Sequence, residues 1–207
     1  MLIEIEKNIE SRKETDRVMW FSMWILLSVA SFGIAWFLMI YFLIKRRNDH
    51  FSRQERLETL ILSRLRQLSK EKSGQQNSTS VSAKTENARF FRNAQAWALS
   101  TLLIFPAFYV FYFLKMDFQK HEEHEHAFLM EASRLAQDSG FTLNPDGFTK
   151  KFASDRYLIL TIVTCGFGAV YWLYRIFNDY NQHFRRQWKL EDDLLRFFKS
   201  LNNSKAS

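Results

Sequence analysis

Two polar trios recur along the chain with the spacing of one helix face. Each has a histidine, a glutamine four residues later and a glutamate four residues after that; they are His50, Gln54 and Glu58, and His183, Gln187 and Glu191. On an α-helix, residues four apart lie on one face, so each trio lines about two turns. The spacing predicts either hydrogen bonding on a helix surface or a polar seam where helices, subunits or a ligand dock.

A second group of ionisable residues, at positions 121–126, reads HEEHEH. On a helix His121 would share a face with Glu125, and Glu122 with His126, so ligands for a divalent metal are present. The spacing lacks the pattern of a known metal motif, and a solvated, acid-rich stretch of helix is the simpler interpretation. We therefore expect no metal site and no cofactor.

The trios belong to an internal repeat. Residues 24–62 align without a gap with residues 157–195, giving 11 identities among 39 pairs. Most identities follow the apolar part of each copy, where they form the largely polar pattern N-x-H-F-x-R-Q-x-x-L-E. Because a polar pattern does not recur through apolar composition alone, we interpret the two segments as copies of one unit.

A fainter third copy follows the middle apolar block. It consists of Asp117, Phe118, Lys120, His121, Glu122 and Glu125. The topology predicted below places this segment on the other side of a membrane from the two clear copies. Whether it is a third copy stays open at the level of the sequence.

Three apolar blocks must position these groups, and each has the length of a transmembrane helix. Val18–Ile44 contains no charged residue, and at about 1.5 Å per residue it reaches roughly 40 Å. The second block is Ala96–Leu114, in which Pro106 predicts a kink, and the third is Tyr157–Phe177. We predict an all-α integral membrane protein with three transmembrane helices and amphipathic cytoplasmic helical extensions.

Basic residues follow the first and third blocks, which predicts that both exits face the cytoplasm. The expected location is the cell membrane, multi-pass, with the N-terminus outside and the C-terminus in the cytoplasm. The expected units are an external tail (1–17), a first repeat (18–72), a flexible cytoplasmic linker (73–94), a second transmembrane helix with an external loop (95–156), and a second repeat (157–207).

The net charge of +7 arises from cations that gather beside the apolar blocks, so the lipid bilayer is the expected partner and nucleic acid is not. Gly33, Gly166 and Gly168 lie inside the blocks, where a small residue more often permits close helix packing than ligand binding. Apolar stripes follow each trio, and each stripe needs a partner in the other copy or in a second subunit. They predict homo-oligomerisation.

The second copy carries Thr164, Gly166, Tyr171, Trp172 and Tyr174 in the stretch TCGFGAVYWLYR. This stretch resembles the motif T-x-G-x-x-x-x-Y-W-x-Y of an uncharacterised family of small prokaryotic multi-span membrane proteins, a domain of unknown function. The first copy keeps Ser31 and Gly33 but has Leu38 and Met39 in place of Tyr and Trp. The resemblance covers the two repeats; it implies a membrane protein and no particular activity.

No arrangement of a nucleophile with a base, and no glycine-rich phosphate loop, occurs in the sequence, so we expect a protein that is not an enzyme. The predicted function is an oligomeric membrane module that acts as a scaffold, a sensor or a recruiter of a membrane or cytoplasmic protein partner. The alternative is an ion channel or membrane-permeabilising effector. Its pore would be lined by Ser28, Ser31, Thr161 and Thr164.

Overall fold

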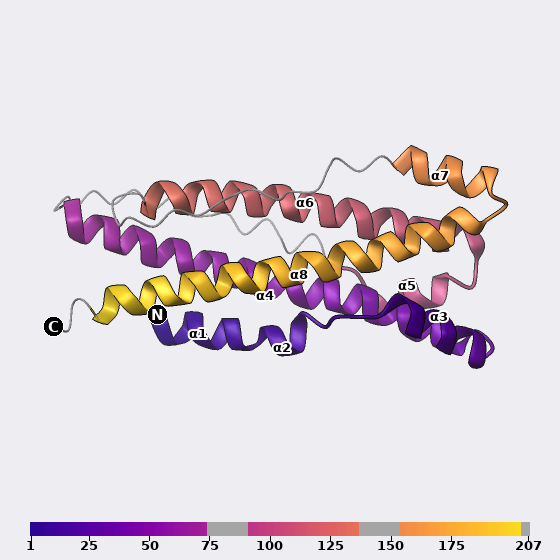
Figure 1. Ribbon diagram of the computed structural model, residues 1–207, viewed down its shortest axis with the longest axis horizontal. Helices are drawn as coiled ribbons and strands as arrows, with labels where there is room; N and C mark the ends of the chain where they lie inside the picture. Colours follow the sequence, from indigo (N-terminus) through magenta and orange to yellow (C-terminus); the bar gives the residue numbers. More distant parts are fainter. Residues whose placement is uncertain (74–90, 137–153, 204–207) are drawn as a thin grey trace.

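The computed structural model describes residues 1–73, 91–136 and 154–203, and most of them are helical. Figure 1 shows an elongated bundle in which three long helices run side by side. This confirms the all-α class. The helices in chain order are α1 (Leu2–Glu10), α2 (Arg12–Thr15), α3 (Phe21–Ala30), α4 (Ile34–Ser73), α5 (Ala94–Ser100), α6 (Ile104–Ala136), α7 (Ser154–Val163) and α8 (Phe167–Asn203).

Each apolar block folds into a helical hairpin, whereas the sequence analysis predicted one unbroken helix per block. The chain reverses between α3 and α4, between α5 and α6, and between α7 and α8. All three reversals lie at one end of the bundle, on the right in Figure 1. Among the described residues no helix is at once long enough and apolar enough to cross a membrane.

The first and third hairpins turn in the same way. Gly33 N–H donates to Ser28 O at 2.8 Å, and Gly166 N–H donates to Thr161 O at 2.8 Å, which is the six-to-one bond of a Schellman motif. Both glycines have a positive φ, +92° and +100°, which suits a residue without a Cβ. The internal repeat is therefore also a structural repeat.

The Ser and Thr that precede these glycines bridge the two arms of each hairpin. Ser31 Oγ accepts a hydrogen bond from Ala35 N–H at 2.8 Å, and Thr164 Oγ1 accepts one from Gly168 N–H at 2.7 Å. Each hydroxyl thus supplies an acceptor for an N–H in the first turn of a long helix. The T-x-G part of the motif forms this turn.

Two expectations about the apolar blocks were wrong in detail. Pro106 lies in the first turn of α6, where its missing N–H is not needed, so it introduces no kink. Gly33 and Gly166 form turns and would have nothing within 4 Å of an added Cβ. Only Gly168 permits close packing, because a Cβ there would lie 2.5 Å from the backbone nitrogen of Thr161.

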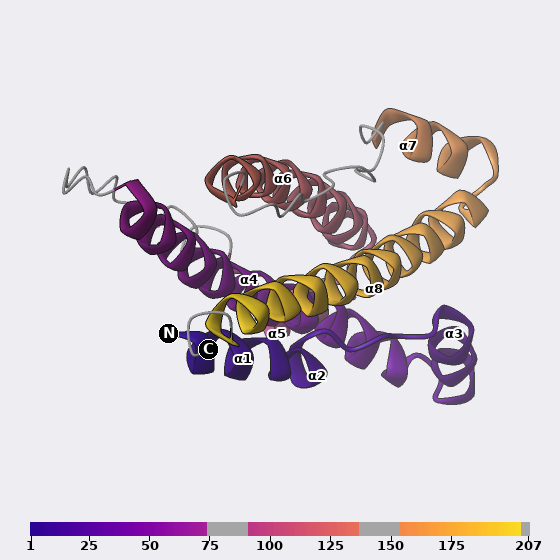
Figure 2. The ribbon, with the colours of Figure 1, turned by 60° about the vertical axis from the view of Figure 1, so that its left-hand side comes forward.

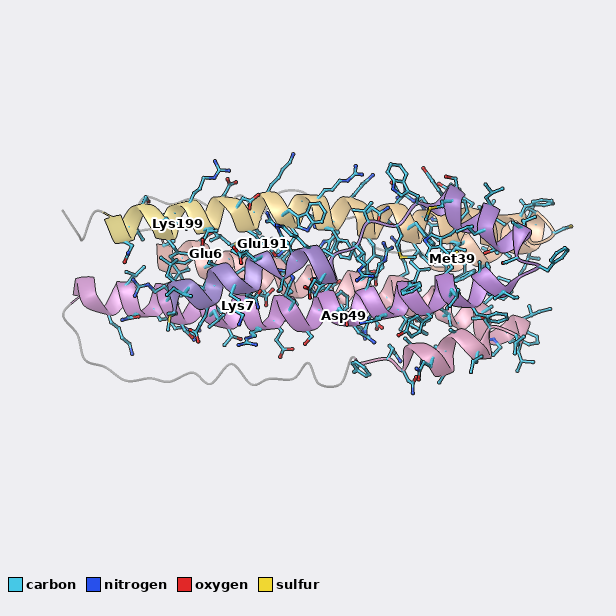
Figure 3. The ribbon with its side chains drawn as sticks, turned by 90° about the horizontal axis from the view of Figure 1, so that it is seen from below. Glu6, Lys7, Met39, Asp49, Glu191 and Lys199 are labelled. Atoms are coloured by element: carbon cyan, nitrogen blue, oxygen red, sulfur yellow. The ribbon has the colours of Figure 1, made fainter. Side chains whose placement is uncertain are left out.

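The interior has two apolar clusters separated by a polar layer. One cluster lies toward the hairpin turns and includes Met39, labelled in Figure 3. The other lies in the opposite half of the bundle and contains both apolar stripes, including Leu57 and Phe198, packed on α1 and α6. The stripes therefore pack against helices of the same chain and do not need a second subunit. Homo-oligomerisation stays a prediction, but the stripes no longer argue for it.

The N-terminal segment is part of the bundle and not a separate tail. Figure 2 shows α1 and α2 beside α4 and α8. Ile5 is fully buried in the second apolar cluster, and Lys199 Nζ donates to Glu6 Oε1 at 2.5 Å. Both residues of this pair are labelled in Figure 3. Residues 1–17 and the C-terminal half of α8 consequently lie together, whereas the sequence analysis expected them on opposite sides of a membrane. Most of the predicted linker at 73–94 falls outside the described residues.

Candidate functional site

The polar layer at the centre of the bundle contains a cluster of three histidines. His50 comes from α4, His121 from α6 and His183 from α8, so each long helix contributes one. The three ring centroids form a triangle with 5.2 Å on every side. His50 Nε2 lies 3.2 Å from His183 Nε2, and one nitrogen of each ring lies within 4.8 Å of the other two.

Asp16, which follows α2, holds the ring of His50. Its Oδ1 lies 2.9 Å from His50 Nδ1, while Arg53 and Trp188 donate to Oδ2 at 2.8 and 3.1 Å. Burial disfavours the charged form of Asp16, but the contacts with His50 and Arg53 outweigh it and hold the pKa of this carboxyl below its usual range. An ionised Asp16 accepts a hydrogen bond from His50 Nδ1–H. The ring proton is therefore on Nδ1, and His50 Nε2 keeps its lone pair.

Charged groups from α6 and α8 surround His183. Its Nδ1 lies 3.1 Å from Arg186 Nη2, 3.6 Å from Glu122 Oε1 and 3.8 Å from Glu125 Oε2. Burial lowers the pKa of His183 to about 4, against an opposing effect of Glu122. At neutral pH this imidazole is uncharged.

The third ring, His121, packs face to face on Phe51 with 4.1 Å between the ring centroids. Its Nε2 is buried and has no hydrogen-bond partner among the described residues. Burial, and then the neighbouring histidines, lower the pKa of His121 well below its ordinary value. All three imidazoles are therefore neutral in the folded chain, because burial also lowers the pKa of His50.

A layer of amide and carboxyl groups lies one turn further along the same helices. Gln54, Glu125 and Gln187 each follow a cluster histidine by four residues, and all three are buried. One side-chain oxygen on each has no hydrogen-bond partner among the described residues. Burial raises the pKa of Glu125 to about 8, so its carboxyl is largely protonated at neutral pH.

The next turn carries the glutamates of the two trios. Glu191 Oε1 lies 2.8 Å from Arg53 Nη1, and burial raises the pKa of Glu191 to about 7. Glu58 Oε2 lies 3.3 Å from His124 Nδ1. The predicted seam is thus an interior column between α4 and α8, closed on the third side by α6.

The sequence analysis placed the His–Gln–Glu trios on common faces but missed two members of the site. His121 was interpreted as part of a solvated cluster, and Asp16 as part of a tail. The signal for His121 was the faint third copy, because His121 and Glu125 follow His50 and Gln54 by 71 residues each. Because each apolar block folds as a hairpin, the polar parts of all three copies lie on the same side of the hairpin turns.

The end of the bundle that carries the turns has an uncharged and apolar surface. At the three tips, Phe32, Phe105 and Phe167 are 99%, 88% and 79% exposed. Further exposed apolar residues lie around them; they are Leu26, Val29, Ile34, Leu102, Leu103, Ile104, Ile162 and Val163. Residues 18–44, 93–114 and 157–174 contain no Asp, Glu, Lys or Arg.

Cations and ion pairs begin where the apolar surface ends. The cations that flank the hairpin arms, here called the basic ring, are Arg17, Lys45, Arg92, Arg156 and Arg175. Just inside the ring, Asp117 contacts Arg47 at 2.8 Å and Arg92 of the ring at 3.2 Å, and Lys115 pairs with Asp179. This layer of charge separates the apolar end from the histidine cluster.

The four hydroxyls that a pore would need are engaged within their own hairpins. Ser28 and Thr161 donate to the carbonyls of Trp24 and Tyr157, four residues earlier, at 2.8 and 2.7 Å. The hydroxyls of Ser31 and Thr164 accept the turn hydrogen bonds described above. These contacts leave the channel alternative without a specific observation in its favour.

The fold and site together define an all-α bundle of three helical hairpins with a buried histidine cluster and one apolar end. No family model, curated protein or solved structure matches the chain. The resemblance to the uncharacterised membrane family therefore stays a prediction, and the function is argued from the geometry.

Proposed function

We propose that the protein is a non-enzymatic membrane module that inserts its three hairpin tips into one leaflet of a lipid bilayer. The polar half of the bundle then stays at the membrane surface, where it acts as a scaffold or sensor. One observation carries the proposal: the exposed and uncharged tips of all three hairpins gather at one end of the molecule (Figure 1).

The size and chemistry of this apolar end favour lipid over water. An exposed apolar cluster of this extent marks an interaction surface. Transfer of one phenylalanine or leucine side chain out of water contributes about 1.5–3 kcal/mol, and each tip offers several such side chains. Because every tip is uncharged, the bilayer interior is a suitable partner for all three.

The backbone at the tips also meets the requirement of a lipid environment. A polar backbone group in hydrocarbon must find its partner within the protein. In the first and third tips, the Schellman bonds of Gly33 and Gly166 and the hydroxyls of Ser31 and Thr164 supply partners for the groups of the turn. These turns can therefore enter the hydrocarbon without unpaired N–H groups there.

The length of the hairpin arms sets the depth. The ten residues of α3 and of α7 correspond to about 15 Å each, which is half of the roughly 30 Å hydrocarbon core. Near that distance from the tips lie the basic ring and the exposed aromatic residues Trp20, Tyr112 and Tyr174, which are suited to the headgroup level, and Tyr109 and Tyr171 lie about one turn nearer the tips. The arrangement fits insertion into one leaflet.

A groove that begins at this level and continues along α4 as far as Arg56 offers a place for an anionic headgroup. It has a volume of about 760 Å³ and lies between the N-terminal segment and α4. Its lining combines the cations Arg17, Lys45, Arg46, Arg53 and Arg56 and the carboxylates Glu14 and Asp49 with the apolar residues Met23, Trp24 and Phe42, so cations outnumber carboxylates. Cations above an apolar lining are suited to a phosphate headgroup with its acyl chain, and they favour the leaflet that is rich in anionic lipid.

The single cysteine provides a direct test. Cys165 lies in the turn of the third hairpin and is exposed. A nitroxide attached to Cys165 in vesicle-bound protein should collide with oxygen, which concentrates in hydrocarbon, and should be shielded from a water-soluble nickel complex. The matched control is Cys165→Ser combined with Asp193→Cys, which places the label on the exposed polar face of α8. Equal access of the nickel complex to both labels would refute the proposal.

A further inference from the structure

We propose that His50, His121 and His183 bind one divalent transition-metal ion, with zinc as the best match, through one ring nitrogen each. The inference goes beyond the membrane role. It concerns the centre of the bundle, where His50 lies five residues past Lys45 and His183 eight residues past Arg175, and it does not depend on insertion of the tips.

The spacing of the rings is close to that of a tetrahedral site. Zinc–nitrogen bonds of about 2.0–2.1 Å place two ligand nitrogens roughly 3.3 Å apart. The Nε2 atoms of His50 and His183 are already 3.2 Å apart. One nitrogen of His121 lies within 4.8 Å of both, so it needs to approach by about 1–1.5 Å, which side-chain rotation can supply.

The carboxylates beside the rings are placed as partners of metal-bound histidines. A histidine that binds a metal through one nitrogen almost always donates the other N–H to a carboxylate, a carbonyl or water, which fixes the ring orientation. Asp16 does this for His50 Nδ1 at 2.9 Å. At His183 Nδ1 the nearest group is Arg186 Nη2 at 3.1 Å, and Glu122 lies at 3.6 Å, so the ring has to turn its Nδ1–H toward Glu122 when Nε2 binds the metal. Asp16 is itself held by Arg53 and Trp188, so it acts as a positioning residue.

The layer one turn further along the helices accounts for the fourth ligand. Oxygens of Gln54, Gln187 and Glu125, one from each long helix, are buried without a hydrogen-bond partner among the described residues. Buried acceptors of this kind need a donor. A water bound to the metal at the fourth position donates toward this layer, and three protein ligands with one water is a common coordination for zinc.

The ligand set selects the class of metal. Neutral imidazole nitrogens suit zinc and its neighbours cobalt, nickel and copper, whereas calcium and magnesium prefer oxygen ligands. Surface chelation by the HEEHEH segment is a separate possibility, because His124 and His126 are exposed on the outer face of α6.

The first test uses the unaltered full chain, purified in mild detergent and stripped of metal. Titration with Zn²⁺ should give one ion per chain, and Co²⁺ should give the visible absorption bands of a tetrahedral site. X-ray absorption at the zinc edge should show three imidazole ligands. Failure to bind one equivalent, or coordination by two or fewer imidazoles, would overturn the proposal without any variant being needed.

The second test assigns the ligands with substitutions. His50→Gln, His121→Gln and His183→Gln should each weaken Zn²⁺ binding by more than the roughly 100-fold that removal of an outer partner can cause. The control is the double variant His124→Gln/His126→Gln, which removes the two remaining histidines and should leave the affinity within about threefold. Binding that is lost in the control, or that survives all three core substitutions, contradicts the assignment. Circular dichroism identifies any variant that does not fold. The ligands are then assigned from the Co²⁺ and X-ray absorption spectra of the unaltered chain.

Discussion

At the scale of single residues, Phe32 combines two unfavourable properties. It is 99% exposed, and its φ of +51° lies in the left-handed region, which costs an L-residue about 1–2 kcal/mol. Among the residues that the structure describes, none covers this side chain, which stands free of the hairpin. Insertion of the tip into lipid gives this residue a favourable contact.

Replacement of Phe32 by glycine should separate stability from membrane binding. The free energy of unfolding in detergent should rise by about 1 kcal/mol because the left-handed strain is relieved. Partitioning onto vesicles should fall by about thirtyfold, the equivalent of about 2 kcal/mol of lost apolar transfer. Cys165→Gly is the matched control, because Cys165 occupies the same turn position with φ of +50°. It should show the gain in stability with a smaller loss of partitioning; equal partitioning of the Phe32→Gly variant and the unaltered chain would contradict the account.

A second prediction at this scale concerns Asp16. Asp16→Asn keeps a hydrogen-bond acceptor for His50 Nδ1 but removes the negative charge that pairs with Arg53. Zinc affinity should fall by about 10–100-fold, as expected for loss of an outer partner. Competition with a chromophoric chelator measures this change. Asp193→Asn, at an exposed position, should leave the affinity unchanged, and an unchanged affinity for Asp16→Asn would remove the positioning role.

At the scale of elements, the first apolar block shows what length and polarity can predict. A charge-free run of 27 residues is long and apolar enough for a single membrane crossing. Its length and polarity are equally compatible with two short antiparallel helices joined by a turn. The deciding signals are local: Ser31 and Gly33, repeated as Thr164 and Gly166, form the turn. One glycine in an apolar helix is usually tolerated, so this signal was not sufficient to predict the reversal.

The middle hairpin was still harder to predict, because its turn contains no glycine. α5 ends at Ser100 and α6 begins at Ile104, with Thr101 O–H donating to Ala98 O at 2.6 Å. Pro106 marked the start of α6, and the sequence alone supported a kink equally well. By contrast, four-residue spacing correctly placed the members of each trio on a common helix face, since that spacing is a direct property of the α-helix.

Gly168 gives an element-scale prediction about the third hairpin. A methyl group there would meet the backbone of Thr161, so Gly168→Ala should push α7 away from α8 and destabilise the chain by about 1–3 kcal/mol. Chemical unfolding followed by circular dichroism measures the change. The equivalent position in the first hairpin is Ala35, so Ala35→Gly serves as the matched control and should change stability by about 1 kcal/mol or less. A neutral Gly168→Ala variant would disprove the close approach of the two arms.

At the scale of the whole molecule, the arrangement places apolar tips, basic ring, ion pairs, histidine cluster and distal apolar cluster in sequence along one axis. Each long helix contributes to the tips, the ion pairs, the histidine cluster and the distal apolar cluster, which explains how a repeat in the sequence becomes a layered bundle. The predicted sidedness depended on an odd number of crossings between the copies. With three hairpins, the two clear copies lie on the same side of the hairpin turns, and no membrane crossing between them is needed. The faint third copy lies on that side too.

The position of the two ends of the chain relative to the membrane tests the central claim most directly. In a Cys165→Ser background, Glu4→Cys and Asp193→Cys place single thiols on α1 and on the distal half of α8, both at exposed positions. Sealed vesicles of one orientation are treated with a membrane-impermeant maleimide before and after lysis. One-leaflet insertion predicts that the two thiols react together, either both before lysis or both only after it. Reaction of one thiol before lysis and of the other only after it would contradict the account, because an odd number of membrane crossings would then separate the two positions.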